Sequence, residues 1–344
     1  MKRWDIFCRV VDNYGDAAVC WRLARQLATE HAACVRLWID KPATLDRLQP
    51  ERGDVAILHW TETADFGEPA DVAVDAFDAG LPPAYAARMP AHSLWIKLEY
   101  LSAEAWVEEH HGLPSPHPTL PVRRHFFFPG FSERTGGLLR ERNLFERRDA
   151  FEPARFWREL GFEPASADTT VVSFFGYENP AAGELLRAWA EGPRPVLLAV
   201  TDCPLRAAVE AFGERGNLRV RTLPFLPQAR YDELLWACDW NFVRGEDSFV
   251  RAQWAARPFV WQIYPQKDGA HRAKLDAFLH LYGEEAGSLW RAWNGWGGGI
   301  GTAWEVLAER AAPLRARARD WAARLGAQAD LAGRLAQFAE IPLK

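Results

Sequence analysis

Two aspartates lie four residues apart in a short segment that could bind and deprotonate a nucleophile. The segment Val11-Asp12-Asn13-Tyr14-Gly15-Asp16 follows an apolar run at residues 6–11 and precedes a helical pattern at residues 17–31. Two carboxylates at the turn between a strand and a helix can position an acceptor and take its proton. From spacing alone a structural role is the stronger alternative, because Asp16 would cap a helix beginning at Ala17 and Gly15 would permit the turn.

A second candidate site is the run Arg244-Gly245-Glu246-Asp247-Ser248-Phe249, which follows an apolar stretch at residues 240–243. The pattern after it is helical, so the run predicts a strand–turn–helix unit with glycine at the turn. The N–H groups at such a helix start attract phosphate oxygens, and Ser248 adds a hydroxyl donor. Glu246 and Asp247 would repel a phosphate, so we expect them to face a sugar or an acceptor. Capping of the helix by Asp247 or Ser248 is an alternative of equal weight.

Two aromatic segments could complete a nucleotide pocket. The segment Phe174-Phe175-Gly176-Tyr177 ends a predicted strand, where a ring and a phenol can pack a base and contact a phosphate. The segment Pro224-Phe225-Leu226-Pro227-Gln228, with Tyr231 after it, offers an amide that suits the edge of a pyrimidine. Core packing of the first segment and a proline-bounded loop with an exposed Gln228 are the structural alternatives.

Short apolar runs alternate with helical patterns along most of the chain, which predicts βαβ units and mostly parallel sheets. The expected strands lie at residues 6–11, 35–39, 55–60, 72–76 and 94–98, and again at residues 171–175, 196–200, 218–223, 240–243 and 259–263. The expected helices include residues 17–31, 181–191 and 231–237 and a helical tail from Ala303 to Ala339. Ligands of such sheets bind at the carboxyl ends of the strands, where all four candidate segments lie.

The length of 344 residues favours two domains. We expect an N-terminal Rossmann-like domain at residues 1–165 and a C-terminal Rossmann-like domain at residues 166–325. A final helix follows at residues 326–344, and packing back on the first domain is one arrangement open to it.

The composition excludes several classes of protein. A net charge of −5 and a pI of about 6.0 argue against a general nucleic-acid-binding protein, which needs a basic face. The five cysteines include no Cys-x-x-Cys pair and predict buried thiols in a reducing cytoplasm. No apolar stretch approaches the roughly 18 residues of a membrane span. The sequence contains no P-loop, no Gly-x-Ser-x-Gly elbow and no Asp-x-Asp metal motif.

Taken together, these segments resemble the EarP family, the bacterial arginine rhamnosyltransferases of elongation factor P. The matching segments are Val11 to Asp16, Glu99-Tyr100-Leu101-Ser102-Ala103-Glu104, Pro129-Gly130-Phe131-Ser132-Glu133 with Gly136-Gly137-Leu138, Phe175-Gly176-Tyr177, Pro224 to Gln228, and Arg244 to Gln253 followed by Ile263-Tyr264-Pro265-Gln266. The resemblance covers nearly the whole chain, is weakest in the helical tail, and is most specific from Arg244 to Gln253.

The resemblance implies an α/β protein of the GT-B fold, with two facing Rossmann-like domains and a helical C-terminal tail. It implies an inverting transfer of L-rhamnose from TDP-β-L-rhamnose to an arginine of elongation factor P, without a metal or another cofactor. The protein acceptor would bind the N-terminal domain and the nucleotide sugar the C-terminal domain. Such an enzyme would be cytoplasmic and would bind neither nucleic acid nor a membrane.

The resemblance also implies roles for individual residues. Asp16 matches the general base, Asp12 a second essential aspartate, and Glu246 a glutamate needed for activity. The predicted donor-binding residues are Asn13, Tyr14, Gly15, Phe175, Tyr177, Phe225, Gln228, Tyr231, Arg244, Gly245, Asp247 and Ser248. The family often carries Phe where this chain has Tyr14 and Tyr231, and both replacements keep the ring.

Three other functions stay open at this point. A GT-B enzyme with a lipid or polysaccharide acceptor would share the donor site but need an apolar or basic acceptor face. A nucleotide-sugar epimerase of similar architecture would turn over the donor with no acceptor present. A non-catalytic module that only docks on elongation factor P would tolerate the loss of Asp12 and Asp16.

Overall fold

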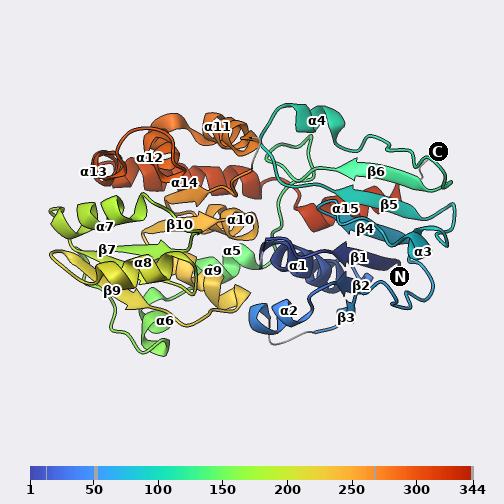
Figure 1. Ribbon diagram of the computed structural model, residues 1–344, viewed down its shortest axis with the longest axis horizontal. Coiled ribbons are helices and arrows are strands. Elements are labelled where there is room, and N and C mark those ends of the chain that lie inside the picture. The colour runs from blue at the N-terminus through green and yellow to red at the C-terminus, as the bar shows by residue number, and fades with distance from the viewer. Residues whose placement is uncertain (13, 50–52, 267–268, 342–344) are drawn as a thin grey trace. The chain divides into compact units, whose positions relative to one another are not determined.

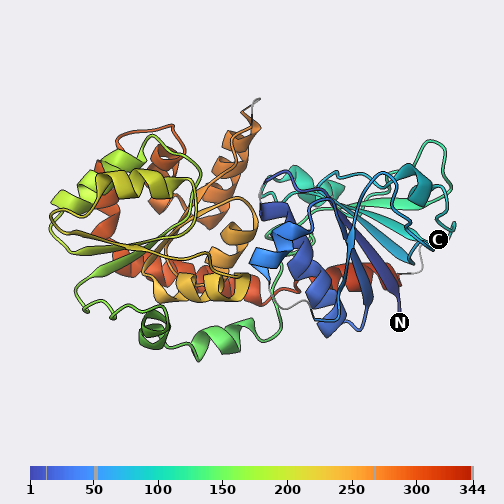
Figure 2. The same ribbon diagram turned by 60° about the horizontal axis from the view of Figure 1, so that its bottom comes forward.

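The computed structural model describes residues 1–12, 14–49, 53–266 and 269–341, so the predicted donor residue Asn13 lies outside the described residues. Over this part of the chain, contacts separate two compact units. Residues 1–142 with 325–344 form the first unit, and residues 143–324 form the second. Each unit is built on one parallel sheet flanked by helices (Figure 1 and Figure 2).

The first unit has a six-stranded sheet, counted over the described residues, with the order β3-β2-β1-β4-β5-β6. Its strands are β1 (Arg3–Cys8), β2 (Cys34–Ile39), β3 (Ala56–His59), β4 (Val72–Ala76), β5 (Leu94–Leu98) and β6 (Arg123–Phe127). Its helices are α1 (Gly15–Glu30), α2 (Ala43–Leu48), α3 (Pro83–Ala86), α4 (Trp106–His110) and α15 (Leu331–Glu340). The order reverses between β1 and β4, which makes this pair the switch point of a Rossmann-like sheet.

The second unit has a five-stranded sheet in its described residues, with the order β11-β10-β7-β8-β9. Its strands are β7 (Thr170–Phe174), β8 (Val196–Val200), β9 (Leu218–Thr222), β10 (Trp240–Arg244) and β11 (Phe259–Gln262). Its helices are α5 (Leu144–Asp149), α6 (Pro153–Glu159), α7 (Ala182–Glu191), α8 (Leu205–Phe212), α9 (Gln228–Ala237), α10 (Asp247–Trp254), α11 (Ala270–Tyr282), the 3-10 helix Glu284–Ala286, α12 (Gly287–Trp293), α13 (Ile300–Ala308) and α14 (Ala311–Gly326). Here the switch point lies between β7 and β10.

The division between the units falls after Arg142, whereas the sequence led us to expect a boundary after residue 165. The helices α5 and α6 join the second unit because α6 buries Phe156 and Trp157 in the core that covers one face of the second sheet. At the other end of the chain, α15 packs against α1 of the first unit (Figure 1). The Gln26 amide of α1 donates to Asp330 Oδ1, just before α15, over 2.9 Å.

The strand expectations differ from the structure where hydrogen bonds or exposure override the apolar pattern. The strands at residues 72–76, 94–98 and 196–200 are confirmed residue for residue. The first strand was expected at residues 6–11 but ends at Cys8, because carboxylates take the next N–H groups. Asp40 accepts from Val10 and Asp16 accepts from Val11. The strand β6 was not predicted, because this edge strand is half-exposed and begins Arg-Arg-His.

The composition led to expectations about the cysteines and about membrane-spanning helices. None of the five cysteines forms a disulfide, but Cys34 is exposed and Cys203 is half-buried, so the prediction that all five are buried is wrong. Among the described helices, none has the length and apolarity needed to cross a membrane.

A buried ion pair joins α9 to α10 in the second unit. Asp232 and Arg251 are 1% and 2% exposed, and the guanidinium donates from Nε to Oδ1 (2.9 Å) and from Nη2 to Oδ2 (2.7 Å). Loss of one partner would leave the other charge buried and unmatched, which is strongly destabilising. The pair therefore fixes the two helices whose first turns carry Gln228, Tyr231 and Asp247.

We expect Asp232→Ala to lower the free energy of unfolding by about 3–5 kcal/mol, because Arg251 would stay buried without its carboxylate. Urea unfolding followed by tryptophan fluorescence would measure the change. Glu159→Ala is the matched control, because Glu159 belongs to an exposed pair with Arg155, and its loss should leave the transition nearly unchanged. Equal effects of the two variants would show that the buried pair does not hold α9 to α10.

Candidate functional site

The Asp16 carboxylate holds the loop that follows β1. Its Oδ2 accepts hydrogen bonds from the N–H groups of Val11 (2.8 Å) and Asp12 (2.9 Å). The helix α1 begins at Gly15 with Tyr14 at the N-cap position, so the alternative of Asp16 as an N-cap is wrong. Both backbone bonds fall on Oδ2, so among the described residues Oδ1 is the carboxylate oxygen left for a substrate.

Asp12 lies close to the start of α1. The Gly15 N–H donates to the Asp12 carbonyl over 2.6 Å, and a Cβ on Gly15 would come within 2.9 Å of Asp12 Oδ2. A larger residue at this position would have to displace the Asp12 carboxylate. Burial raises the pKa of the Asp16 carboxyl group, and the negative charge of Asp12 raises it further, although the two backbone N–H groups oppose both effects. The loop therefore concentrates negative charge and contains a carboxylate more basic than usual.

In the second unit, Arg244 ends β10 between two aromatic rings. Its guanidinium carbon lies 4.7 Å from the centre of the Phe175 ring and 4.5 Å from that of Tyr177. Phe175 also packs edge-on against Tyr231 of α9, with ring centroids 5.4 Å apart. The strands β7 and β10 are parallel neighbours at the switch point, so their carboxyl ends bring these residues together. A guanidinium held between rings is suited to phosphate oxygens, which its planar fork can bind in pairs.

The turn after β10 has a left-handed residue and leads into the helix α10. Gly245 has a φ of +62°, a conformation that favours glycine. The helix α10 begins at Asp247, and its N-cap residue is Glu246, whose side chain makes no capping hydrogen bond. The N-cap position is therefore not that of Asp247 or Ser248. The N–H groups at the start of a helix suit an anion.

Ser248 is oriented differently from its predicted use as a phosphate donor. Its Oγ accepts from the Arg244 N–H over 3.2 Å and donates to the Arg244 carbonyl. The single hydroxyl hydrogen is thereby engaged within the turn. In this structure Ser248 fastens the backbone of Arg244 and so fixes where the guanidinium begins.

Gln228 and Tyr231 lie in the first turn of α9. Gln228 is 6% exposed, so the alternative of an exposed loop residue is wrong. Burial raises the pKa of the Tyr231 phenol well above its ordinary value of 10.0, so the phenol stays protonated and can donate a hydrogen bond. Phe225 is half-buried in the loop that leads to this helix.

The end of β11 contributes two positioning residues that the sequence analysis missed. Gln262 Oε1 accepts from the Tyr177 N–H over 2.8 Å, and Trp261 Nε1 donates to the Gly245 carbonyl over 2.7 Å. A Cβ on Gly176 would come within 2.4 Å of Leu205 Cδ1 and 2.7 Å of Gln262 Oε1, so a larger residue would have to displace both side chains. The strand β11 thus fastens the loops after both β7 and β10. A polar residue that ends the apolar run Phe259-Val260-Trp261 is the signal that could have found Gln262.

The structure brings the predicted residues together within each unit. In the first unit, Asp12, Tyr14, Gly15 and Asp16 belong to one loop and the helix start after it. In the second unit, the predicted donor residues follow β7, β9 and β10 at the carboxyl edge of the sheet. Within the described residues, no group of three or more His, Cys, Asp or Glu side chains is placed to hold a metal ion.

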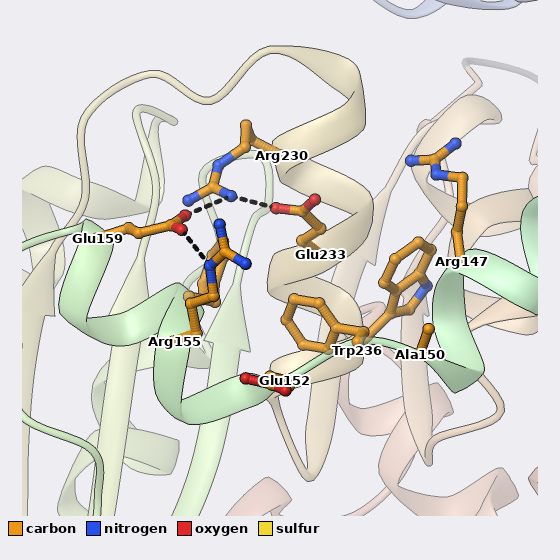
Figure 3. A pocket seen from close by; sticks show the side chains of 10 residues that line it. Arg147, Ala150, Glu152, Arg155, Glu159, Arg230, Glu233 and Trp236 are labelled. Atoms are coloured by element: carbon orange, nitrogen blue, oxygen red, sulfur yellow. Dashed lines mark hydrogen bonds and ion pairs between the residues drawn. The ribbon is translucent and has the colours of Figure 1, made fainter.

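A separate open cavity of about 430 Å³ lies along α6 and α9 (Figure 3). Two of its three arginines are matched by carboxylates, because Glu159 pairs with Arg155 (2.8 Å) and with Arg230 (3.1 Å), and Arg230 also pairs with Glu233. A phosphate would have to compete with these carboxylates for the two cations. The cavity is therefore a poorer candidate for a nucleotide than the carboxyl edge of the sheet.

We expect Asp16→Asn to raise the stability of the protein at pH 7, because the amide oxygen can still accept both loop N–H groups and a buried charge is removed. Folding raises the pKa of Asp16, so the native carboxyl group binds its proton more tightly than the unfolded one. Stability therefore falls as the pH rises through the native pKa, and the gain from Asn should shrink as the pH falls toward the ordinary value of 3.8.

Thermal unfolding midpoints at pH 7 and pH 4 would measure this gain. Asp16→Ala is the contrasting variant, because it also removes the acceptor for Val11 and Asp12 and should lower the midpoint at both pH values. An Asn variant with no gain at pH 7 would contradict the destabilising burial of the Asp16 charge.

Comparison with known proteins places the chain in a family. A family model described as elongation factor P (EF-P) rhamnosyltransferase EarP matches residues 4–340. A protein-arginine rhamnosyltransferase of Pseudomonas aeruginosa is 45% identical over 374 residues, with 98% of this chain and 99% of the relative covered. A structure that addresses EarP-mediated arginine glycosylation of translation elongation factor EF-P is 34% identical with a TM-score of 0.72, and both chains are fully covered (100% each).

A more distant structure shares the fold alone. The calicheamicin glycosyltransferase is 14% identical with a TM-score of 0.56 and 98% of each chain covered. These matches, with the two Rossmann-like sheets and the helical C-terminal region, confirm the predicted GT-B fold class and the prediction of an enzyme that is a glycosyltransferase. The chain therefore belongs to the EarP family of elongation factor P rhamnosyltransferases.

Proposed function

We propose that this protein transfers L-rhamnose from TDP-β-L-rhamnose to one arginine of elongation factor P, with inversion at the anomeric carbon. The relative named as a protein-arginine rhamnosyltransferase supports the sugar, and the structure concerned with EF-P arginine glycosylation supports the acceptor. The observation that carries the mechanism is the buried Asp16 carboxylate, which is anchored through Oδ2 and beside Asp12.

The acceptor sets the chemical problem. A guanidinium group has a pKa above ~12 and is a poor nucleophile while it is charged. Asp12 and Asp16 bind its fork and orient one Nη toward the sugar. The raised pKa of Asp16 makes it a stronger base than an ordinary aspartate, but it stays a far weaker base than a guanidine. Proton transfer therefore accompanies bond formation, which lowers the basicity of the nitrogen.

The bonds exchange in one step. The Nη attacks C1 of rhamnose from the face opposite TDP, the bond from C1 to the diphosphate oxygen breaks, and the Nη proton passes to Asp16. The products are rhamnosyl-arginine, TDP and one proton. Attack from the opposite face inverts the configuration at C1.

The donor site in the second unit stabilises the leaving TDP. Arg244, Tyr177 and the start of α10 from Gly245 onward meet the charge that develops on the diphosphate. Phe175 and Gln228 suit the base, and we propose that Glu246 contacts the sugar. We propose that this cation and helix start serve in place of a divalent metal, and that the reaction takes place in the cytoplasm, where translation factors act.

Elongation factor P incubated with the protein and TDP-β-L-rhamnose in EDTA should gain one deoxyhexose on a single arginine. Intact-mass spectrometry and peptide mapping would measure the gain. Asp16→Asn should abolish it while calorimetry shows unchanged donor affinity, because the base is lost and the donor site is not. Near-native turnover by that variant would refute the assignment of the base.

The other outcomes separate the competing functions. Donor binding without any gain in mass would point to another acceptor, and donor turnover without elongation factor P would favour an epimerase. A gain that EDTA abolishes would show that a metal is needed.

We expect Arg244→Lys to raise the KM for the donor roughly tenfold, because lysine keeps the charge but loses the planar fork held between two rings. Initial rates at varied TDP-β-L-rhamnose would measure it. Arg215→Lys is the matched control, because Arg215 stacks on Phe212 at 4.1 Å but is exposed before β9. A donor KM that responds equally to both changes, or to neither, would argue against Arg244 as a phosphate-binding residue.

A further inference from the structure

The turn after β4 holds two bulky residues in an unfavourable backbone conformation. Phe77 and Asp78 have φ values of +58° and +57°, a region that residues with side chains rarely adopt. The Ala79 N–H donates to the Ala76 carbonyl over 3.1 Å, which closes a tight turn around them. Turns with two left-handed central residues normally use Gly, Asn or Asp, so the backbone conformation at position 77 is unfavourable for phenylalanine.

The strained turn is held from both ends. Asp75 is 2% exposed, and its Oδ1 accepts from the Gly80 N–H over 2.8 Å. The Phe77 N–H donates to the Leu98 carbonyl at the end of β5 over 2.7 Å. Glycine at position 77 would relieve the strain but would also remove the ring. Strain that the surroundings enforce in this way is typical of functional sites.

The Phe77 ring supports the ring of Tyr100. Their centroids lie 4.7 Å apart with 19° between the planes. Phe77 is 9% exposed, whereas Tyr100 is 40% exposed. Tyr100 follows β5 by two residues, and the stacking places its ring over the end of β4, the neighbouring strand.

This aromatic stack lies at the same edge of the sheet as the Asp12–Asp16 loop. The strands β4 and β1 are parallel neighbours, with Phe7 of β1 paired to Asp75 of β4. Neighbouring strands are about 4.8 Å apart. Because β1 and β4 form the switch point, ligands of such a sheet bind between the loops that follow them.

We propose that the Tyr100 ring, supported by Phe77, is the platform on which the acceptor arginine stacks while Asp12 and Asp16 bind its edge. This inference rests on the proposed function. A guanidinium prefers to lie flat on an aromatic ring and to donate within its own plane, so one side chain can satisfy both partners at once. Lys97 of the neighbouring strand β5 pairs with Asp78 over 3.0 Å, so this cation is already matched by a carboxylate.

The test is a comparison of the two KM values. Tyr100→Ala should raise the KM for elongation factor P about tenfold and leave the KM for TDP-β-L-rhamnose unchanged. Tyr100→Phe keeps the ring and should restore the wild-type KM within about twofold. Initial rates from intact-mass spectrometry, with each substrate varied in turn, would measure all three proteins.

Ile341→Ala is the matched control. Ile341 is 49% exposed and follows α15, whose Ala339 carbonyl accepts from Lys2 at the amino end of β1, the opposite edge of the sheet. It should change neither KM. An unchanged acceptor KM in Tyr100→Ala, or an equal rise in both KM values, would overturn the platform alone. A wild-type protein that transfers no rhamnose would overturn the proposed function, and the platform with it.

Discussion

In each unit the strand order reverses beside the first strand, so the loops after two adjacent parallel strands leave the sheet in opposite directions. The residues of these loops no longer form hydrogen bonds between strands, so their N–H groups need other acceptors. Side chains of the candidate site meet that need: Asp16 accepts from Val11 and Asp12, and Gln262 accepts from Tyr177. The residues proposed for chemistry and for its support are therefore also those that hold the loops in place.

The electrostatic character of the two units matches two different ligands. The loop after β1 holds paired carboxylates, one of them with a pKa raised by burial, and suits a cationic acceptor. The end of β10 holds Arg244 beside two aromatic rings and the start of α10, and suits an anionic diphosphate. An arginine acceptor and a nucleotide-sugar donor have these opposite charges.

Two features that position side chains in this protein have an energetic cost. The buried pair of Asp232 and Arg251 takes two charges out of water to join α9 to α10. The turn at Phe77 and Asp78 retains a strained backbone and keeps an aromatic ring beneath Tyr100. Both features place side chains at the carboxyl edge of a sheet. Stability alone gives no reason for either, because apolar residues could replace the ion pair and glycine could relieve the turn.

The sequence by itself determined the parallel α/β architecture, because a strand buried on both faces, such as residues 196–200, is a continuous apolar run. It also located the candidate loops, since polar residues directly after such runs lie at the carboxyl edge. The tertiary structure alone decided which atoms those residues contact. Strand order and loop paths decide three such contacts. They are the hydrogen bond from the Val11 N–H to Asp16, the burial of Gln228, and the stacking of Tyr100 on Phe77. Apolar periodicity is a local property of the chain, whereas these contacts join segments that only the folded sheet brings together.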